Sequence, residues 1–412
     1  MHNLCRLRSV VDSTERAKAV SYAKVNPLFV ACFMTFVIYI GSFMRTPIIP
    51  LYARDLGATL TEVGLITSSY MVVASFLAVP LGSTSDRLGR RRLAIVGSLL
   101  VGSSSLLMIL ANSPTLIMVM YTLAGLGLAC YSPAVTAFIG DVSRSDKVGR
   151  FYGTYTTVQQ VAIASGPAVG GLIAGILGFR NVFGLSGAIV LIGSIIAFLY
   201  FPKESSGRSN APSLSVSEGF NLLRASSVVL ISWISVFTVS FMWGVSQTFL
   251  PIYAETVGIG VAIVGVLFAV QSATNAILRI PLGAVYDRLA KKWLLMIVGV
   301  ISEALATALV ASVATPLMLG VLMILIGFGM GVTQMAASAL ISESSNRATR
   351  GLGMGFYYTC FYGGMAVSPG ALGFVISALG FQPGFLAAAV VGLAAILVVL
   401  AITYRAARHT AH

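Results

Sequence analysis

Apolar stretches of about 20 residues recur along almost the whole chain, and they constrain its fold more than any other feature. Each stretch is long enough to cross a hydrocarbon core of about 30 Å as an α-helix. Of the 412 residues, 57% are hydrophobic and only 9% are charged, whereas soluble domains carry roughly 25% charged residues. The sequence therefore predicts an all-α membrane protein.

Twelve of these stretches are predicted to be transmembrane helices. The first half contains six of them, at 28–52, 63–81, 93–111, 116–139, 152–176 and 183–201. The second half contains the other six, at 228–253, 261–282, 294–313, 317–341, 353–379 and 385–404.

The lysines and arginines, which give the chain a net charge of +13, collect in the loops on one side of these helices. Only Arg54 and Arg180 lie in loops on the other side, and Arg45 and Arg279 lie within helices. This asymmetry follows the positive-inside rule and predicts a multi-pass protein of the cytoplasmic membrane with both termini in the cytoplasm. The basic charge thus reports topology and gives no reason to expect a nucleic-acid partner.

Segments of the first half recur about 201 residues later. PLYARDLGATLTEVG from Pro50 returns as PIYAETVGIGVAIVG from Pro251, and PLGSTSDRLGRR from Pro80 returns as PLGAVYDRLAKK from Pro281. The repeat predicts two pseudo-symmetric six-helix bundles, and the polar, Ser- and Pro-containing segment between them reads as a flexible linker. The expected organisation is a cytoplasmic tail at 1–24, bundles at 25–201 and 226–405, a linker at 202–225 and a tail at 406–412.

The loop after the second helix carries a signature of the form G-x-x-x-D-R-x-G-R-R, and a degenerate copy follows the eighth helix. This signature resembles that of the major facilitator superfamily of transporters, and the resemblance extends over essentially the whole chain. It implies two bundles that rock to open a central site alternately to each side of the membrane. The residues that carry it are Gly82, Asp86, Arg87, Gly89, Arg90 and Arg91.

The resemblance implies that this loop acts as a latch. Asp86 is expected to meet the start of the eleventh helix and Arg90 to reach Asp141, in contacts that exist only when the cytoplasmic side is closed. The equivalent set in the second half is Asp287 with Glu343 at the end of the tenth helix, and with Arg347 or Arg350 nearby. The plainer alternative is that the charges serve only as a topology signal. The predicted gating residues at this side are Asp86, Arg87, Arg90, Asp141, Asp287, Arg288 and Glu343.

The fifth helix resembles the family's antiporter signature, G-x8-G-x3-G-P-x2-G-G, with Ala162 in place of the second glycine. Small residues at this spacing allow close helix approach, and proline bends a helix, so Gly166 and Pro167 are predicted to act in gating. The signature favours an exporter related to the drug and metabolite proton antiporters; the alternative is ordinary small-residue packing. Tyr121 stands where such antiporters usually carry an arginine.

Two charged residues within predicted helices are candidate functional groups. Glu303 lies near the middle of the ninth helix, where a charge is costly, and is either a proton-coupling residue or a protonated carboxyl bonded to a neighbouring helix. Arg45 continues a polar stripe with Tyr39 and Ser42 on the first helix. It either binds an anionic group of the substrate, or pairs with an outer acid such as Asp55, or extends to the surface.

Polar and aromatic residues at helical spacing are expected to line a central cavity, because amides in hydrocarbon need polar partners. Roughly half of these residues can instead form hydrogen bonds between helices and make no contact with the substrate. Arg279, two residues before Pro281 and near the cytoplasmic surface, is interpreted as structural. The predicted substrate-binding residues are Tyr39, Ser42, Arg45, Tyr121, Gln159, Gln160, Trp243, Gln247, Gln271, Asn275, Gln334, Tyr358 and Tyr362.

The sequence thus predicts a monomeric secondary transporter that moves a small organic or amphipathic molecule, with proton-coupled efflux as the first hypothesis. The alternative is an importer or facilitator of an organic anion, and a remoter one is a membrane sensor that does not transport. No metal, cofactor or enzymatic activity is expected, because the histidines lie in the tails and no paired carboxylates or cysteine clusters occur.

Overall fold

The computed structural model describes residues 27–143, 148–201, 220, 223, 226–345 and 350–410. Some helical residues, among them 82–87 and 350–351, are described by their backbone only. Every regular element in these ranges is a helix, and twelve of the helical segments are long and apolar enough to span a membrane. The all-α fold is therefore confirmed. The predicted tail at 1–24 and most of the linker at 202–225 lie outside the described residues, so the domain boundaries stay predictions.

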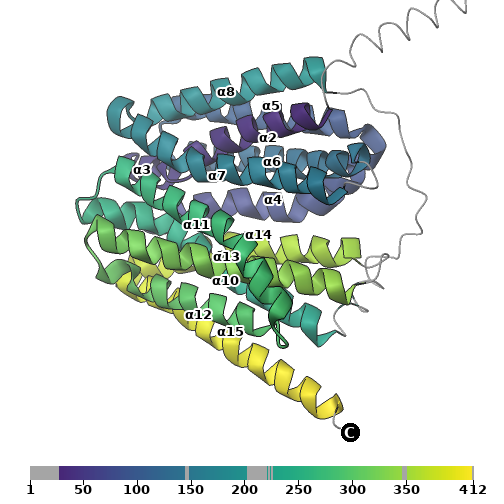
Figure 1. Cartoon of the computed structure of the whole chain (residues 1–412). Helices are drawn as coiled ribbons and strands as arrows, with labels where there is room; N and C mark the ends of the chain where they lie inside the picture. Colours follow the sequence, from purple (N-terminus) through teal and green to yellow (C-terminus); the bar gives the residue numbers. More distant parts are fainter. Residues whose placement is uncertain are drawn as a thin grey trace, which may run out of the picture.

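The first six spans pack together as one bundle (Figure 1). Within it, α6 contacts α4 and α5, and α2 contacts α7 and α8. Ser113 caps the start of α6 by accepting a hydrogen bond from the backbone N–H of Leu116, which satisfies one of the free donors of the first turn. Its helices are α2 (Pro27–Met44), α3 (Ile48–Asp55), α4 (Leu60–Leu88), α5 (Arg90–Leu107), α6 (Pro114–Val142), α7 (Val148–Leu177) and α8 (Phe179–Tyr200).

The last six spans form the second bundle, which lies beside the first (Figure 1). Two helix pairs make most of the contact between the bundles, namely α4 with α14 and α7 with α11. These pairs are equivalent under the 201-residue repeat, so the two bundles are pseudo-symmetric. The second set consists of α10 (Ser227–Thr256), α11 (Val261–Arg288), α12 (Leu294–Leu309), α13 (Pro316–Ser344), α14 (Arg350–Leu379) and α15 (Phe381–Thr410).

Two helix boundaries differ from the sequence-based expectation. The first span is not one straight helix, because a turn at residues 45–47 separates α2 from α3, and Pro47 supplies no backbone N–H there. Helix α4 continues to Leu88, so the acidic residue of the loop signature belongs to its last turn and not to a loop. Only Gly89 separates α4 from α5, and its φ of 97° is a conformation that glycine adopts without strain.

We call the two ends of the molecule the terminal face and the loop face. The terminal face carries the start of α2 and the end of α15, and the loop face is the opposite end, where α3 leads into α4. In the described part of the chain, twelve helical segments run between these two faces.

Candidate functional site

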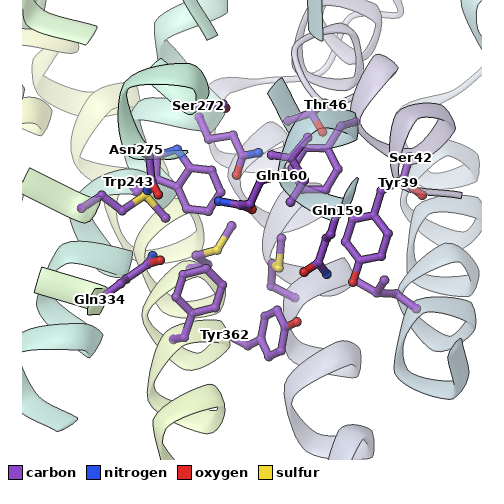
Figure 2. A pocket seen from close by; sticks show the side chains of 18 of the residues that line it. Tyr39, Ser42, Thr46, Gln159, Gln160, Trp243, Ser272, Asn275, Gln334 and Tyr362 are labelled. Carbon is purple, nitrogen blue, oxygen red and sulfur yellow. The ribbon is translucent and has the colours of Figure 1, made fainter. Parts of the chain in front are cut away.

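A cavity of about 210 Å³ lies between the two bundles, and side chains from both of them line it (Figure 2). The first bundle contributes residues of α2, α4, α6 and α7, and the second contributes residues of α10, α11, α13 and α14. Concave sites between helical bundles that combine aromatic surface with a few polar groups are typical of small-molecule binding.

Twelve of the thirteen predicted substrate-binding residues line this cavity, and Arg45 is the exception. Whether they bind substrate stays a prediction. The sequence did not indicate several other lining residues, notably Arg279, Tyr70, Ser272 and Tyr357. The lining residues that match the prediction are Tyr39, Ser42, Tyr121, Gln159, Gln160, Trp243, Gln247, Gln271, Asn275, Gln334, Tyr358 and Tyr362.

Arg45 lies behind the cavity wall of the first bundle. Its side chain is 1% exposed, and its Nη1 donates a hydrogen bond to Ser105 Oγ on α5 at 2.6 Å. Its Nε and Nη2 have no hydrogen-bond partner among the described residues. The interpretation that the Arg45 side chain extends to the surface is therefore wrong. Its hydrogen-bond partner is Ser105 and not Asp55. The turn after α2 explains this position, because it directs Arg45 into the bundle.

Glu303 is fully buried on α12 and does not line the cavity. Neither carboxyl oxygen has a hydrogen-bond partner among the described residues, so the expected bond to a neighbouring helix is not present. Its backbone packs closely against Gly329 on α13, one residue before the cavity-lining Met330. Glu303 thus lies one helix layer behind the cavity.

The bundles meet closely at the loop face. A Cβ atom at Gly171 on α7 would lie 2.7 Å from the carbonyl oxygen of Val261 on α11. On the other side of the cavity, Ser68 Oγ accepts a hydrogen bond from the backbone N–H of Gly370 at 2.8 Å. Gly166 packs on Phe43 of α2, where an added Cβ would lie 2.8 Å from that side chain. Helix α7 therefore fits tightly on both of its neighbours, as its glycine pattern predicts.

The cavity opens toward the terminal face. Tyr358 lines the cavity and is nevertheless 49% exposed. A Cβ atom at Gly153 on α7 or at Gly355 on α14, two positions equivalent under the repeat, would meet no atom within 4 Å. The described structure is therefore closed at the loop face and open at the terminal face.

Ion pairs at the terminal face lie within each bundle. Arg90 pairs with Asp141, as the resemblance implies, and Lys292 pairs with Glu343 at 2.8 Å. Glu343 thus has a lysine partner, which the sequence did not indicate. Asp287 is exposed at the end of α11, and its role in gating stays a prediction. Since the Arg90 pair is present while the cavity is open at this face, it does not require a closed terminal face. Burial, together with the charge of Glu343, raises the pKa of Tyr286 beside this pair.

The side chains of Asp86 and Arg87 lie outside the described part of the chain, so their proposed contact with α14 stays a prediction. Arg288 is exposed at the end of α11. No group of histidine, cysteine or carboxylate side chains that could hold a metal occurs among the described residues.

The chain belongs to the major facilitator superfamily, whose family model matches residues 31–255 and 232–412. Its relatives include the MFS-type transporter MJ1560 of Methanocaldococcus jannaschii, which is 23% identical over 86% of this chain and 92% of that protein. The quinolone resistance protein NorA of Staphylococcus aureus is 25% identical, over 50% of this chain and 51% of its own length.

Solved transporter structures share the fold. The nucleoside transporter NupG superposes with a TM-score of 0.77 at 14% identity, over 92% of this chain and 99% of that one. A bacterial homologue of the lysosomal transporter Spinster, solved in an inward-facing conformation, gives a TM-score of 0.79 at 14% identity, over 93% and 96% of the two chains. The protein is therefore a multi-pass membrane transporter of this family.

Proposed function

We propose that this transporter exports a small organic or amphipathic molecule across the cytoplasmic membrane in exchange for protons. The observation that carries the transport cycle is the asymmetric cavity, which pseudo-equivalent helix pairs close at one face while it stays open at the other. Two bundles related in this way can rock about the cavity and expose it to each side in turn.

The charge asymmetry of the loops supports a cytoplasmic terminal face, so the conformation described here would be inward-open. Export is supported by the antiporter-like glycines of α7, which make the close contacts with α2 and α11. The likeness to a quinolone resistance protein over half of the chain adds support for an amphipathic organic substrate.

Gating is assigned to the two faces separately. Gly166 and Pro167 belong to the seal at the loop face, where the carbonyl of Pro167 meets Gly265 on α11. The charged residues Asp86, Arg87 and Arg288, with the two ion pairs, form the proposed latch at the terminal face. The ion pairs would position the loop, and the cross-bundle contacts of Asp86 would form when this face closes.

Proton coupling is assigned to Glu303. The described residues that line the cavity include no aspartate, glutamate or histidine, so a proton carried by the protein needs a carboxyl elsewhere. Glu303 is the buried acid that packs on the cavity helix α13. An unpaired carboxylate is costly inside a membrane, which favours the protonated form in this conformation.

A second candidate function is the import or facilitated diffusion of an organic anion. It is favoured by Arg45, by Arg279 in the cavity wall, and by Tyr121 at the position where antiporters usually carry an arginine.

The two functions differ in their response to a proton gradient. A growth screen over compound classes would first identify a substrate, which is then loaded into vesicles that contain the purified protein. Antiport predicts that an imposed pH gradient accelerates release and drives accumulation against the substrate gradient. Exchange that is equally fast with and without the pH gradient would reject the antiport proposal and favour the facilitator.

A further inference from the structure

The charge of the cavity wall is positive and is not balanced within the wall. Arg279 on α11 lines the cavity, and no described lining residue is an aspartate or glutamate. Guanidinium groups stay protonated under all physiological conditions. Arg279 is therefore the kind of side chain that an anionic ligand in the cavity would pair with.

Two neutral amides hold Arg279 in place. Its Nε donates to Asn275 Oδ1 at 3.1 Å, and its Nη2 donates to Gln334 Oε1 at 2.9 Å. A guanidinium has five N–H donors, and these two bonds use two of them. Amide oxygens orient the fork but do not neutralise it, so the side chain is preorganised for an anionic partner.

Further donors without a partner lie on the same wall. Trp243 Nε1 and Gln334 Nε2 are buried and have no hydrogen-bond acceptor among the described residues. The side-chain oxygen of Gln334 accepts from Arg279, which has no acceptor atom to offer in return, so the NH₂ group of Gln334 is free to donate to a ligand. Figure 2 shows Trp243, Asn275 and Gln334 on the side of the cavity formed by the second bundle. Buried donors without acceptors are costly, and a ligand that carries oxygen acceptors would satisfy them.

Aromatic side chains lie next to these donors. The ring centroid of Trp243 lies 6.1 Å from that of Phe361 on α14. The ring centroid of Phe361 lies 5.3 Å from that of Tyr362 on the same helix. This surface can pack on the ring of a ligand while its acidic group reaches Arg279.

We infer that the substrate of the proposed transport cycle is an aromatic carboxylate, and that Arg279 binds its carboxylate group. Trp243 Nε1 and Gln334 Nε2 donate to the carboxylate oxygens, and Asn275 positions the guanidinium. This inference rests on the proposed function, because it names the substrate class of the same cavity. A purely structural Arg279 would brace α11 against α13 but would give no preference between charged and neutral ligands.

Three probes that share one ring and one chain test the inference: 3-phenylpropanoate, 3-phenylpropanamide and 3-phenylpropylammonium. Their binding to the full-length protein in lipid nanodiscs is measured by calorimetry, with empty nanodiscs to subtract partition into lipid. We expect 3-phenylpropanoate to bind at least about tenfold more tightly than the amide, and the ammonium more weakly still.

Variants then locate the charge preference. Arg279→Gln should weaken binding of 3-phenylpropanoate about tenfold or more and change binding of the amide less than about threefold. Lys291→Gln, which removes one positive charge from an exposed position after α11, should change neither. Should Arg279→Gln fail to fold, Trp243→Phe keeps an aromatic ring, though a smaller one, and removes the N–H, so it should weaken binding of the carboxylate more than binding of the amide.

Equal binding of the three probes, preference for the ammonium, lack of saturable binding of 3-phenylpropanoate, or an equal loss of all probes in Arg279→Gln would overturn the inference. Counterflow in vesicles separates this failure from failure of the proposed function. Arg279-dependent binding without exchange would reject transport and keep the anion site. Exchange of neutral compounds without any anion preference would keep transport and reject the anion site.

Discussion

Gly64 on α4 lies directly against the backbone carbonyl of Pro369 on α14, so closely that a Cβ atom at position 64 would overlap with that oxygen. The equivalent glycine of the second bundle, Gly265 on α11, lies in the same way against the carbonyl of Pro167 on α7. The loop-face seal is thus built twice from one repeat, once on each side of the cavity.

Gly64→Ala should weaken the seal at the loop face, because a backbone carbonyl cannot move aside as a flexible side chain can. Overpacking of this kind costs about 1–3 kcal/mol, which would shift the protein away from the conformation closed at this face. The measurement is the reactivity of an introduced loop-face cysteine with a membrane-impermeant thiol reagent, which should rise. Gly355→Ala is the matched control, since its added methyl group meets no atom within 4 Å. Equal reactivity in both variants would contradict this account of the seal.

Ser105→Ala should destabilise the first bundle, because it removes the hydrogen-bond partner of the buried Arg45 guanidinium. Hydrogen bonds to charged groups contribute about 1.5–3 kcal/mol, and the loss should appear as a lower melting temperature of the purified protein. Ser103→Ala on the same helix is the control, because the Ser103 hydroxyl is bonded only to backbone carbonyls of its own helix. A melting temperature as high as that of the parent would mean that Arg45 finds another partner.

Glu303→Gln keeps the size of the side chain and removes its ability to carry a proton. If Glu303 couples protons to transport, the variant should exchange substrate between the two sides of a vesicle at the parental rate but lose acceleration by a pH gradient. Its melting temperature should not fall, because both oxygens of the parent side chain lack partners. Retention of the full pH-gradient response would show that Glu303 is a structural carboxyl.

The Lys292–Glu343 pair should contribute little to stability, since its side chains are 28% and 49% exposed and surface pairs are worth about 0.2–1 kcal/mol. Glu343→Lys should nevertheless slow transport if the pair positions the terminal-face latch, and the double variant Lys292→Glu with Glu343→Lys should restore the rate. A double variant as slow as the single one would indicate that the pairing itself is not required.

The cavity residues are predictable from the sequence because side-chain amides within a membrane need water or other polar groups as hydrogen-bond partners. Gln159, Gln160 and Gln247 lie within long apolar spans, so a water-filled cavity is the environment that suits them. The same reasoning applies to Trp243, whose side chain also lines the cavity. The family signature supplied the pairing of Arg90 with Asp141, which composition alone does not give.

The errors concern residues whose depth depends on helix boundaries. If the eighth helix ended near Pro281, Arg279 would lie at the surface. Instead, α11 continues through this proline to Arg288, and Arg279 lies in the cavity wall. If the first helix were straight, Arg45 would continue the polar stripe of Tyr39 and Ser42. The turn at residues 45–47 ends α2 before Arg45, and Arg45 does not line the cavity with these two residues. In both cases the spacing of residues along the sequence does not show where a helix turns or ends.

A disulfide across the loop-face seal tests the rocking of the two bundles most directly. A Cβ atom at Gly175 on α7 would lie 3.5 Å from that of Ala262 on α11, which is within the range of a disulfide. In a background without the native cysteines, the double variant Gly175→Cys with Ala262→Cys should form this bond under mild oxidation. Substrate counterflow should then stop, while binding from the terminal face persists, and a reducing agent should restore counterflow. Full transport by the completely cross-linked protein would contradict alternating access through separation of the bundles at this face.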